Sequence, residues 1–262
     1  MSPTTGSAAV RRHTGDVRSL GAGRDAARDL AAAAALVALA AVAVAHLAGF
    51  GAGYVAKSLA VYAVGAALIR RGLTLHHPHS RFGAGNRVTL SRFAMTALFV
   101  ALIGEPLAQR EWMVWALVVA ATLTALLDAA DGALARRSGL ASEFGARFDM
   151  ETDAWFTLVL CTLVLQLEKA GGWVLVSGLM RYVFVAAALV WPWLGAPLPA
   201  KRRRQAVCVT QITVLIVCLG PIIPAAASAV LAALGLAALV LSFAIDVRWL
   251  RRAHSNPGSS SP

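Results

Sequence analysis

Four aspartates lie close together near the middle of the chain, in two pairs whose spacings match the turns of an α-helix. Asp128 and Asp131 are three residues apart, and Asp149 and Asp153 are four residues apart. Each spacing places the two carboxylates of a pair on one face of a helix. The connection between the pairs is short and contains Ser and Gly, so two antiparallel helices would bring all four carboxylates together.

Such a cluster predicts a metal site. Carboxylates in one place repel one another, and they are costly to desolvate at a membrane boundary. A hard divalent cation relieves the repulsion, and oxygen ligands without a nearby His or Cys favour Mg²⁺ or Mn²⁺ over zinc. We therefore expect Mg²⁺ or Mn²⁺ at a site that would also hold phosphate groups. A cluster that only caps helices is the simpler alternative, but the register of the four acids disfavours it.

The elements that must position these aspartates are membrane helices. The chain of 262 residues is 58% hydrophobic and 14% charged, whereas soluble domains average roughly 45–50% apolar and about 25% charged residues. The net charge of +11 is of a kind found in nucleic-acid-binding proteins. Here, however, the basic residues fall in loops between long apolar runs, which is typical of membrane proteins. The sequence predicts an all-α polytopic membrane protein with the lipid bilayer, and no nucleic acid, as its partner.

Eight apolar runs approach the length of about 20 residues that a helix needs to cross a bilayer. They are Leu30–Phe50, Gly53–Ile69, Val88–Gly104, Trp112–Leu127, Phe148–Leu167, Trp173–Trp193, Ala206–Ile223 and Ala225–Asp246. Basic residues concentrate before the first run and after every second run. By the positive-inside rule, both termini and the aspartates are expected on the cytoplasmic side. The expected location is a bacterial inner membrane.

The segment from Asp128 to Asp153 resembles the signature of the class I CDP-alcohol phosphatidyltransferase family, D-x2-D-G-x2-A-R-x8-G-x3-D-x3-D. Every defined position is present: Asp128, Asp131, Gly132, Ala135, Arg136, Gly145, Asp149 and Asp153. The resemblance implies a six-helix catalytic membrane domain over residues 71–250. A two-helix membrane extension over 29–70 would precede it, with a cytoplasmic tail at 1–28 and a disordered tail at 251–262.

The resemblance also implies the activity. These enzymes transfer a phosphatidyl group from a CDP-linked lipid, such as CDP-diacylglycerol, to an alcohol acceptor and release CMP, in phospholipid biosynthesis. Asp128, Asp131 and Asp149 would be metal ligands. Asp153 would be the general base for the acceptor hydroxyl, and would also contact a second metal ion. The resemblance further suggests a homodimer.

Six residues are expected to contact the CDP-linked lipid. They are Asn86, Thr89, Arg92, Gly132, Arg136 and Ser142. The first three form an N-x2-T-x2-R stretch similar to one in the family; a helix cap followed by an interfacial arginine is the alternative. Gly132 would let the backbone approach the nucleotide, Arg136 would bind the diphosphate, and Ser142 would add a hydrogen bond.

Basic residues suggest a phosphorylated acceptor. Arg181 lies within the sixth run, and Lys201 and Arg204 bound a basic stretch before the seventh. Glycerol 3-phosphate is the first choice, with inositol phosphate, serine and choline left open. A structural ion pair of Arg181, and the binding of anionic lipid by the basic stretch, are the alternatives.

Two other functions fit an acidic site in a membrane protein. An intramembrane prenyltransferase also holds a diphosphate with aspartates and Mg²⁺, but its acidic motifs lie in separate halves of the helix bundle. A cation transporter usually places its site near the bilayer midplane, whereas these aspartates are predicted at helix ends.

Overall fold

The computed structural model of the chain describes residues 6–76, 82–138, 142–198 and 202–255, and these residues form helices without any β-strand. The α-helices are α1 (Gly6–Ala48), α2 (Ala52–His76), α3 (Ala84–Ala101), α4 (Glu111–Ser138), α5 (Glu143–Gln166), α6 (Leu175–Val190), α7 (Arg202–Leu219) and α8 (Ala225–Ser255). Three short 3-10 helices are η1 (Leu107–Gln109), η2 (Gly172–Val174) and η3 (Pro192–Gly195). The predicted all-α fold is confirmed, with one α-helix for each apolar run.

Local chemistry accounts for where several helices begin and end. Helix α1 is rich in Ala and Leu, which favour the helix, and it ends at Ala48, next to Gly49 with a φ of 62°. A glycine with positive φ is a common helix end. At the start of α5, the Ser142 hydroxyl accepts a hydrogen bond from the Gly145 amide at 3.0 Å. This bond satisfies one of the amides that a helix N-terminus leaves without a partner.

Five helical segments are long and apolar enough to cross a membrane, among the described residues. They are Asp25–Ala48, Ala52–Leu73, Glu111–Asp128, Gly172–Val190 and Ala225–Ser255. Large apolar side chains remain exposed on these segments, among them Leu47 (72%) and Leu189 (83%). Apolar side chains on the outside of a helix are expected where lipid rather than water surrounds it. The structure therefore supports a polytopic membrane protein.

The other three predicted spans, α3, α5 and α7, do not reach that apolar content. Helix α3 carries Arg87 and Arg92, α5 carries Asp149 and Asp153 among its five charged residues, and α7 begins with three arginines. Charged residues within membrane helices are costly and usually functional. Two of these three helices, α3 and α5, carry the candidate site.

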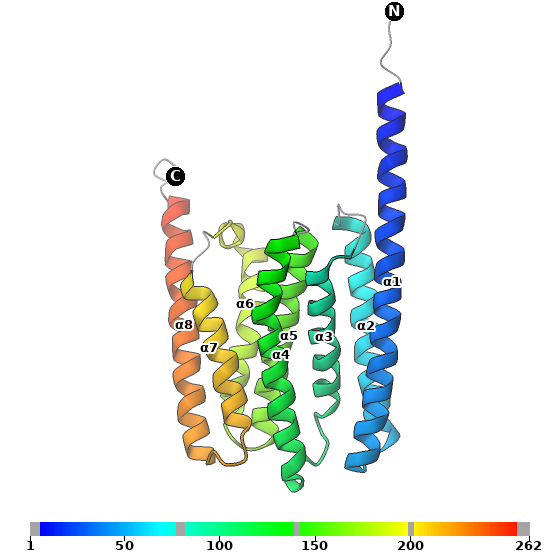
Figure 1. The fold of residues 1–262 in the computed structure, drawn as a ribbon. Helices are drawn as coiled ribbons and strands as arrows, with labels where there is room; N and C mark the ends of the chain where they lie inside the picture. The colour runs from blue at the N-terminus through cyan, green and yellow to red at the C-terminus, as the bar shows by residue number, and fades with distance from the viewer. Residues whose placement is uncertain (1–5, 77–81, 139–141, 199–201, 256–262) are drawn as a thin grey trace, which may run out of the picture. The chain divides into compact units, whose positions relative to one another are not determined.

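The chain forms two compact units, and the first comprises Met1–Glu105 and Leu123–Asp153. Helices α1, α2 and α3 pack on one another in this unit, and Figure 1 shows α1 and α2 side by side. Its core is made of apolar side chains from α1, α2, the segment just before α3, α3 itself and the start of α5. They are Ala26, Leu30, Val37, Tyr62, Ile69, Phe82, Leu90, Ala97, Phe144 and Phe148.

The second unit comprises Pro106–Thr122 and Ala154–Pro262. Helix α7 packs along α8, and both α6 and η3 contact α8. The loop between α7 and α8 is held by Lys169, whose ammonium donates to the carbonyl oxygens of Gly220 at 3.1 Å and Ile223 at 2.5 Å. Helices α4 and α5 each contribute residues to both units.

Helices α1 and α8 are longer than predicted. Helix α1 starts at Gly6, inside the segment 1–28 that was predicted as a tail. Helix α8 continues to Ser255, so residues 251–255 are helical rather than disordered. The His254 ring stacks on Trp193 with ring centroids 6.3 Å apart, and this contact extends the packing of α8 beyond its apolar run. Residues 256–262 lie outside the described part.

Candidate active site

Three aspartates from two helices converge in the first unit. Asp128 lies on α4, and Asp149 and Asp153 lie one turn apart on α5. One carboxylate oxygen of each lies within 4.8 Å of the others. Their side chains are 27%, 41% and 25% exposed, respectively, so incoming groups can reach the carboxylates. The predicted convergence of the two pairs is thus observed for these three residues.

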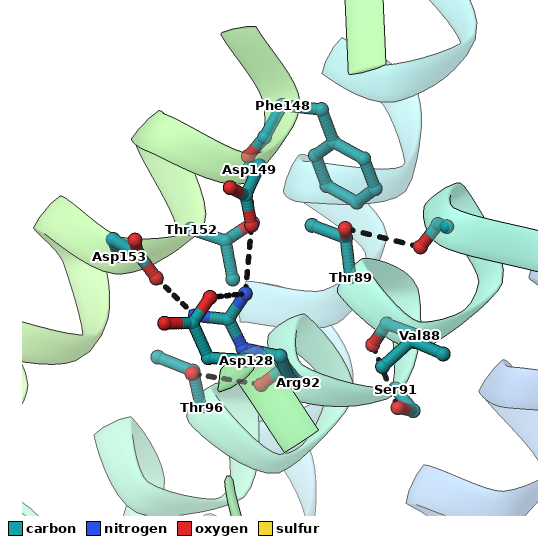
Figure 2. A network of polar contacts seen from close by, with 11 residues as sticks. Val88, Thr89, Ser91, Arg92, Thr96, Asp128, Phe148, Asp149, Thr152 and Asp153 are labelled. Carbon is teal, nitrogen blue, oxygen red and sulfur yellow. Dashed lines mark hydrogen bonds and ion pairs between the residues drawn. The ribbon is translucent and has the colours of Figure 1, made fainter. Parts of the chain in front are cut away.

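A buried arginine lies among the three carboxylates (Figure 2). Arg92 of α3 has a side chain that is only 1% exposed. Its Nη1 is 2.7 Å from Asp128 Oδ1 and 2.7 Å from Asp149 Oδ1, and its Nη2 contacts Asp153 Oδ1. The planar fork of donors on a guanidinium allows one arginine to bind several carboxylates at once. Arg92 therefore joins α3, α4 and α5 through a single side chain.

Hydroxyl groups near this network are satisfied within their own helices. Thr96 Oγ1 donates to the Arg92 carbonyl at 2.8 Å, and Thr152 Oγ1 donates to the Phe148 carbonyl at 2.9 Å. Both threonines are buried. Threonine commonly makes this bond to the carbonyl four residues earlier. Figure 2 shows the Thr96 bond beside the ion pairs that Arg92 makes with the three carboxylates.

The signature glycine Gly145 allows α5 to approach α3 closely. A Cβ atom at this position would lie 2.7 Å from Asn86 Oδ1 and 3.3 Å from Ser142 Oγ. A Cβ contact below 3.0 Å requires one of the groups to shift. Asn86 is buried, and its amide donates to the Phe82 carbonyl. One turn later on α3, the hydroxyl Oγ1 of Thr89 donates to the Gly85 carbonyl at 3.2 Å. The need for glycine here is therefore steric.

The donor set fits a divalent cation. All three available ligands are carboxylate oxygens, which suit Mg²⁺ or Mn²⁺. With all groups ionised, the three carboxylates and one guanidinium among the described side chains carry a formal charge of −2, which one divalent cation would neutralise. The buried position of Arg92 also shows that this site stabilises positive charge. The structure thus supports an acidic cluster that could hold a metal ion.

The position of several predicted site residues relative to these aspartates is not described. The side chains of Asp131, Gly132 and Arg136 lie on α4 outside the part whose side chains are described, and Lys201 lies outside the described residues. Ser142 caps α5 through the Gly145 amide. The roles predicted for these residues stay predictions.

The predicted acceptor residues lie in the second unit. Arg181 is half-buried on α6. Arg204 Nη1 is 3.7 Å from Asp246 Oδ1, and the neighbouring Arg203 Nη2 is closer, at 2.5 Å from the same oxygen. Arg203 also bonds the hydroxyl of Ser242. Asp246 therefore neutralises part of the basic stretch at the start of α7.

Sequence reasoning did not foresee that Arg92 pairs with the aspartates. The sequence predicted contact of Arg92 with the CDP-linked lipid, and a structural ion pair was an alternative only for Arg181. A usable signal was present, because an arginine within an apolar helix needs an anionic partner. Arg92 lies five residues into the Val88–Gly104 run, and the four aspartates were among the acids expected at the same membrane face.

Comparison with known proteins identifies one matching family. The model of the family described as CDP-alcohol phosphatidyltransferase matches residues 82–244, which include α3, the aspartates and most of α8. No curated protein and no solved structure matches the chain. The family match covers more than half of the chain, and it includes Arg92, Asp128, Asp149 and Asp153. The chain therefore belongs to the CDP-alcohol phosphatidyltransferase family.

Proposed function

We propose that this protein transfers a phosphatidyl group from a CDP-linked lipid, such as CDP-diacylglycerol, to the hydroxyl of an alcohol and releases CMP. The observation that carries the proposal is the convergence of Asp128, Asp149 and Asp153 within 4.8 Å of one another on α4 and α5. Family membership favours this reaction over prenyl transfer and cation transport.

The three carboxylates, with Asp131, are suited to hold Mg²⁺ or Mn²⁺. When bound, the metal would supply positive charge to the diphosphate of the CDP-linked lipid, which weakens the bond to the leaving CMP. Asp128 and Asp149 would serve as ligands. Arg136 would add a guanidinium to the diphosphate, and Asn86 and Thr89 would contact the CDP-linked lipid from α3.

Asp153 is the proposed general base. It lies one turn after Asp149 on α5, so it would be next to the metal ligands, and its side chain is 25% exposed, which leaves room for the acceptor to reach it. A carboxylate in this position can take the proton from the acceptor hydroxyl as its oxygen attacks phosphorus. The P–O bond to CMP breaks as the new P–O bond forms, and Asp153 carries the proton away.

The acceptor is proposed to be an alcohol that bears a phosphate, with glycerol 3-phosphate as the first candidate. Arg181 and Arg204 supply guanidinium groups on α6 and α7, and guanidinium binds phosphate oxygens in a two-pronged manner. We further propose that the site and both termini face the cytoplasm of a bacterium, and that the protein forms a homodimer.

The direct test is to give the purified protein CDP-diacylglycerol, Mg²⁺ and a panel of alcohols, and to identify the lipid formed and the CMP released. Glycerol 3-phosphate should give a phosphatidylglycerol phosphate product. CMP release with a different alcohol would change the acceptor and keep the reaction. Absence of CMP release with every alcohol, from protein that is folded and binds Mn²⁺, would overturn the choice of CDP-diacylglycerol as donor.

A further inference from the structure

Helices α1 and α2 lie outside the segment that matches the family, yet they belong to the same compact unit as the site. The family match begins at residue 82, after α2 has ended. Both α1 and α2 nevertheless pack against α3, the helix that carries Arg92. The contacts that join them indicate what this pair of helices does.

Helix α2 receives the side chain next to Arg92. A Cβ atom on Gly65 would lie 1.9 Å from Phe93 Cζ and within 2.8 Å of two further ring atoms. The Phe93 ring thus rests directly on the α2 backbone, and the Tyr62 ring, one turn earlier, lies 5.9 Å away between centroids. Because Phe93 follows Arg92 on α3, the depth of this contact sets how closely α3 approaches α2 at the arginine.

Helix α2 makes a second close contact, with the start of α5. A Cβ atom on Gly72 would lie 2.9 Å from Phe144 Cε2. Phe144 is buried and stacks on Phe148, which directly precedes Asp149. Gly65 and Gly72 are seven residues apart, so both lie on about the same face of α2. One face of α2 therefore contacts both α3 and α5.

Helix α1 holds both α2 and α3 through polar contacts. The hydroxyl of Tyr62 on α2 donates to the Leu30 carbonyl of α1 at 2.7 Å, and this bond is buried. Arg87 Nε of α3 donates to Asp29 Oδ2 of α1 at 2.8 Å. Leu30 and Tyr62 also belong to the core that contains Phe144 and Phe148. The two N-terminal helices are thus packed into the unit that carries the site.

We propose that α1 and α2 are a positioning element of the active site, in which Gly65 and Gly72 set the places of α3 and α5 so that Arg92 meets Asp128, Asp149 and Asp153. This inference rests on the proposed function for the meaning of the site, and on the contacts above for the positioning. Arg92 bonds three carboxylates on two other helices, so a small shift of α3 weakens contacts that depend on tenths of an ångström.

The test compares two alanine substitutions on the same helix. Gly65→Ala places a Cβ against Phe93, whereas a Cβ on Gly53, also in α2, has no atom within 4 Å. Alanine favours the helix over glycine at both positions, so helix propensity cannot cause a loss in either variant. We expect Gly65→Ala to lower CMP release about tenfold and weaken Mn²⁺ binding, measured by electron paramagnetic resonance, severalfold. Gly53→Ala should stay within about twofold of wild type in both.

Relief of the contact provides the decisive readout. In the double variant Gly65→Ala/Phe93→Leu, the smaller side chain makes room for the new Cβ, and Mn²⁺ affinity and CMP release should recover most of the loss. Because relief of the contact would also restore any lost stability, Mn²⁺ affinity is compared at a temperature well below the Tm of every variant, where all of them are folded. If Gly65→Ala does not fold, the same comparison is made with Gly72→Ala, whose added Cβ would lie 2.9 Å from Phe144 Cε2. The double variant is then Gly72→Ala/Phe144→Leu.

The inference is overturned if Gly65→Ala binds Mn²⁺ as wild type does, if Gly53→Ala loses as much, or if Phe93→Leu restores nothing. Wild-type protein that binds Mn²⁺ but releases no CMP would contradict only the proposed donor. The Mn²⁺ affinities of wild type and the variants would still test whether α1 and α2 position the site. Wild-type protein that does not bind Mn²⁺ would overturn both proposals.

Discussion

Arg92 Nη1 on α3 and Asp149 Oδ1 on α5 are 2.7 Å apart, although 57 residues separate them in the chain. The same guanidinium nitrogen is equally close to Asp128 Oδ1 on α4. Buried Arg92 thus links α3, which packs against α1 and α2, to α4 and α5, which carry the aspartates of the signature. The site of this protein combines an acidic cluster with a built-in positive charge, and several consequences can be measured.

Asp153→Asn should lower CMP release by at least about a hundredfold, because an amide cannot accept the proton of the acceptor hydroxyl. Binding of the CDP-linked lipid in the presence of Mn²⁺ should change much less. The matched control is Glu143→Gln on the same helix, since Glu143 is exposed and pairs only with Arg147 among the contacts described. Normal turnover by Asp153→Asn would show that another group is the base.

Arg92→Gln should destabilise the protein by about 3 kcal/mol, because it leaves three carboxylates without their buried cation. Arg87→Gln is the control on the same helix, because its ion pair with Asp29 is 59% exposed on the arginine side and should contribute about 0–1 kcal/mol. Thermal unfolding in detergent measures both, and an equal Tm shift for the two variants would contradict the role of Arg92.

Gly145→Ala should raise the KM for CDP-diacylglycerol severalfold, because the added Cβ would meet Asn86 Oδ1 at 2.7 Å. Either Asn86 or the first turn of α5 must then shift. Gly172→Ala is the control, since a Cβ there has no atom within 4 Å. Steady-state kinetics with varied CDP-diacylglycerol give the answer, and an unchanged KM would mean that Asn86 has no contact with that substrate.

Chelation should abolish CMP release, and Mg²⁺ or Mn²⁺ should restore it, because only carboxylate oxygens are offered by Asp128, Asp149 and Asp153. The measurement is activity after treatment with EDTA, followed by titration with each metal. Full activity in excess EDTA would exclude a metal requirement.

Arg204→Gln should raise the KM for a phosphorylated acceptor about tenfold while the KM for CDP-diacylglycerol stays unchanged, if Arg204 binds the acceptor phosphate. Arg252→Gln, in the last turn of α8, serves as a control for the general loss of one positive charge. Equal effects on the two KM values would assign Arg204 to structure, consistent with its 3.7 Å distance from Asp246.

The sequence by itself determined the class of the protein and the presence of an acidic site. Helical periodicity is local, so spacings of three and four residues were enough to place each pair of aspartates on one helix face. The length of the apolar runs and the charge of the loops are also local properties, so they were enough to predict the helices. The eight matching signature positions then identified the family, which the match over residues 82–244 confirmed.

Only the tertiary structure decided which residue faces which across helices. The contacts of Arg92 with the aspartates, of Gly145 with Asn86, and of Gly65 with Phe93 join segments that are far apart in the chain. Such contacts depend on the depth and rotation with which helices pack, and no single helix carries that information in its periodicity. For the same reason the N-terminal helices read as a plain extension in sequence, while packing joins them to the helix that bears Arg92.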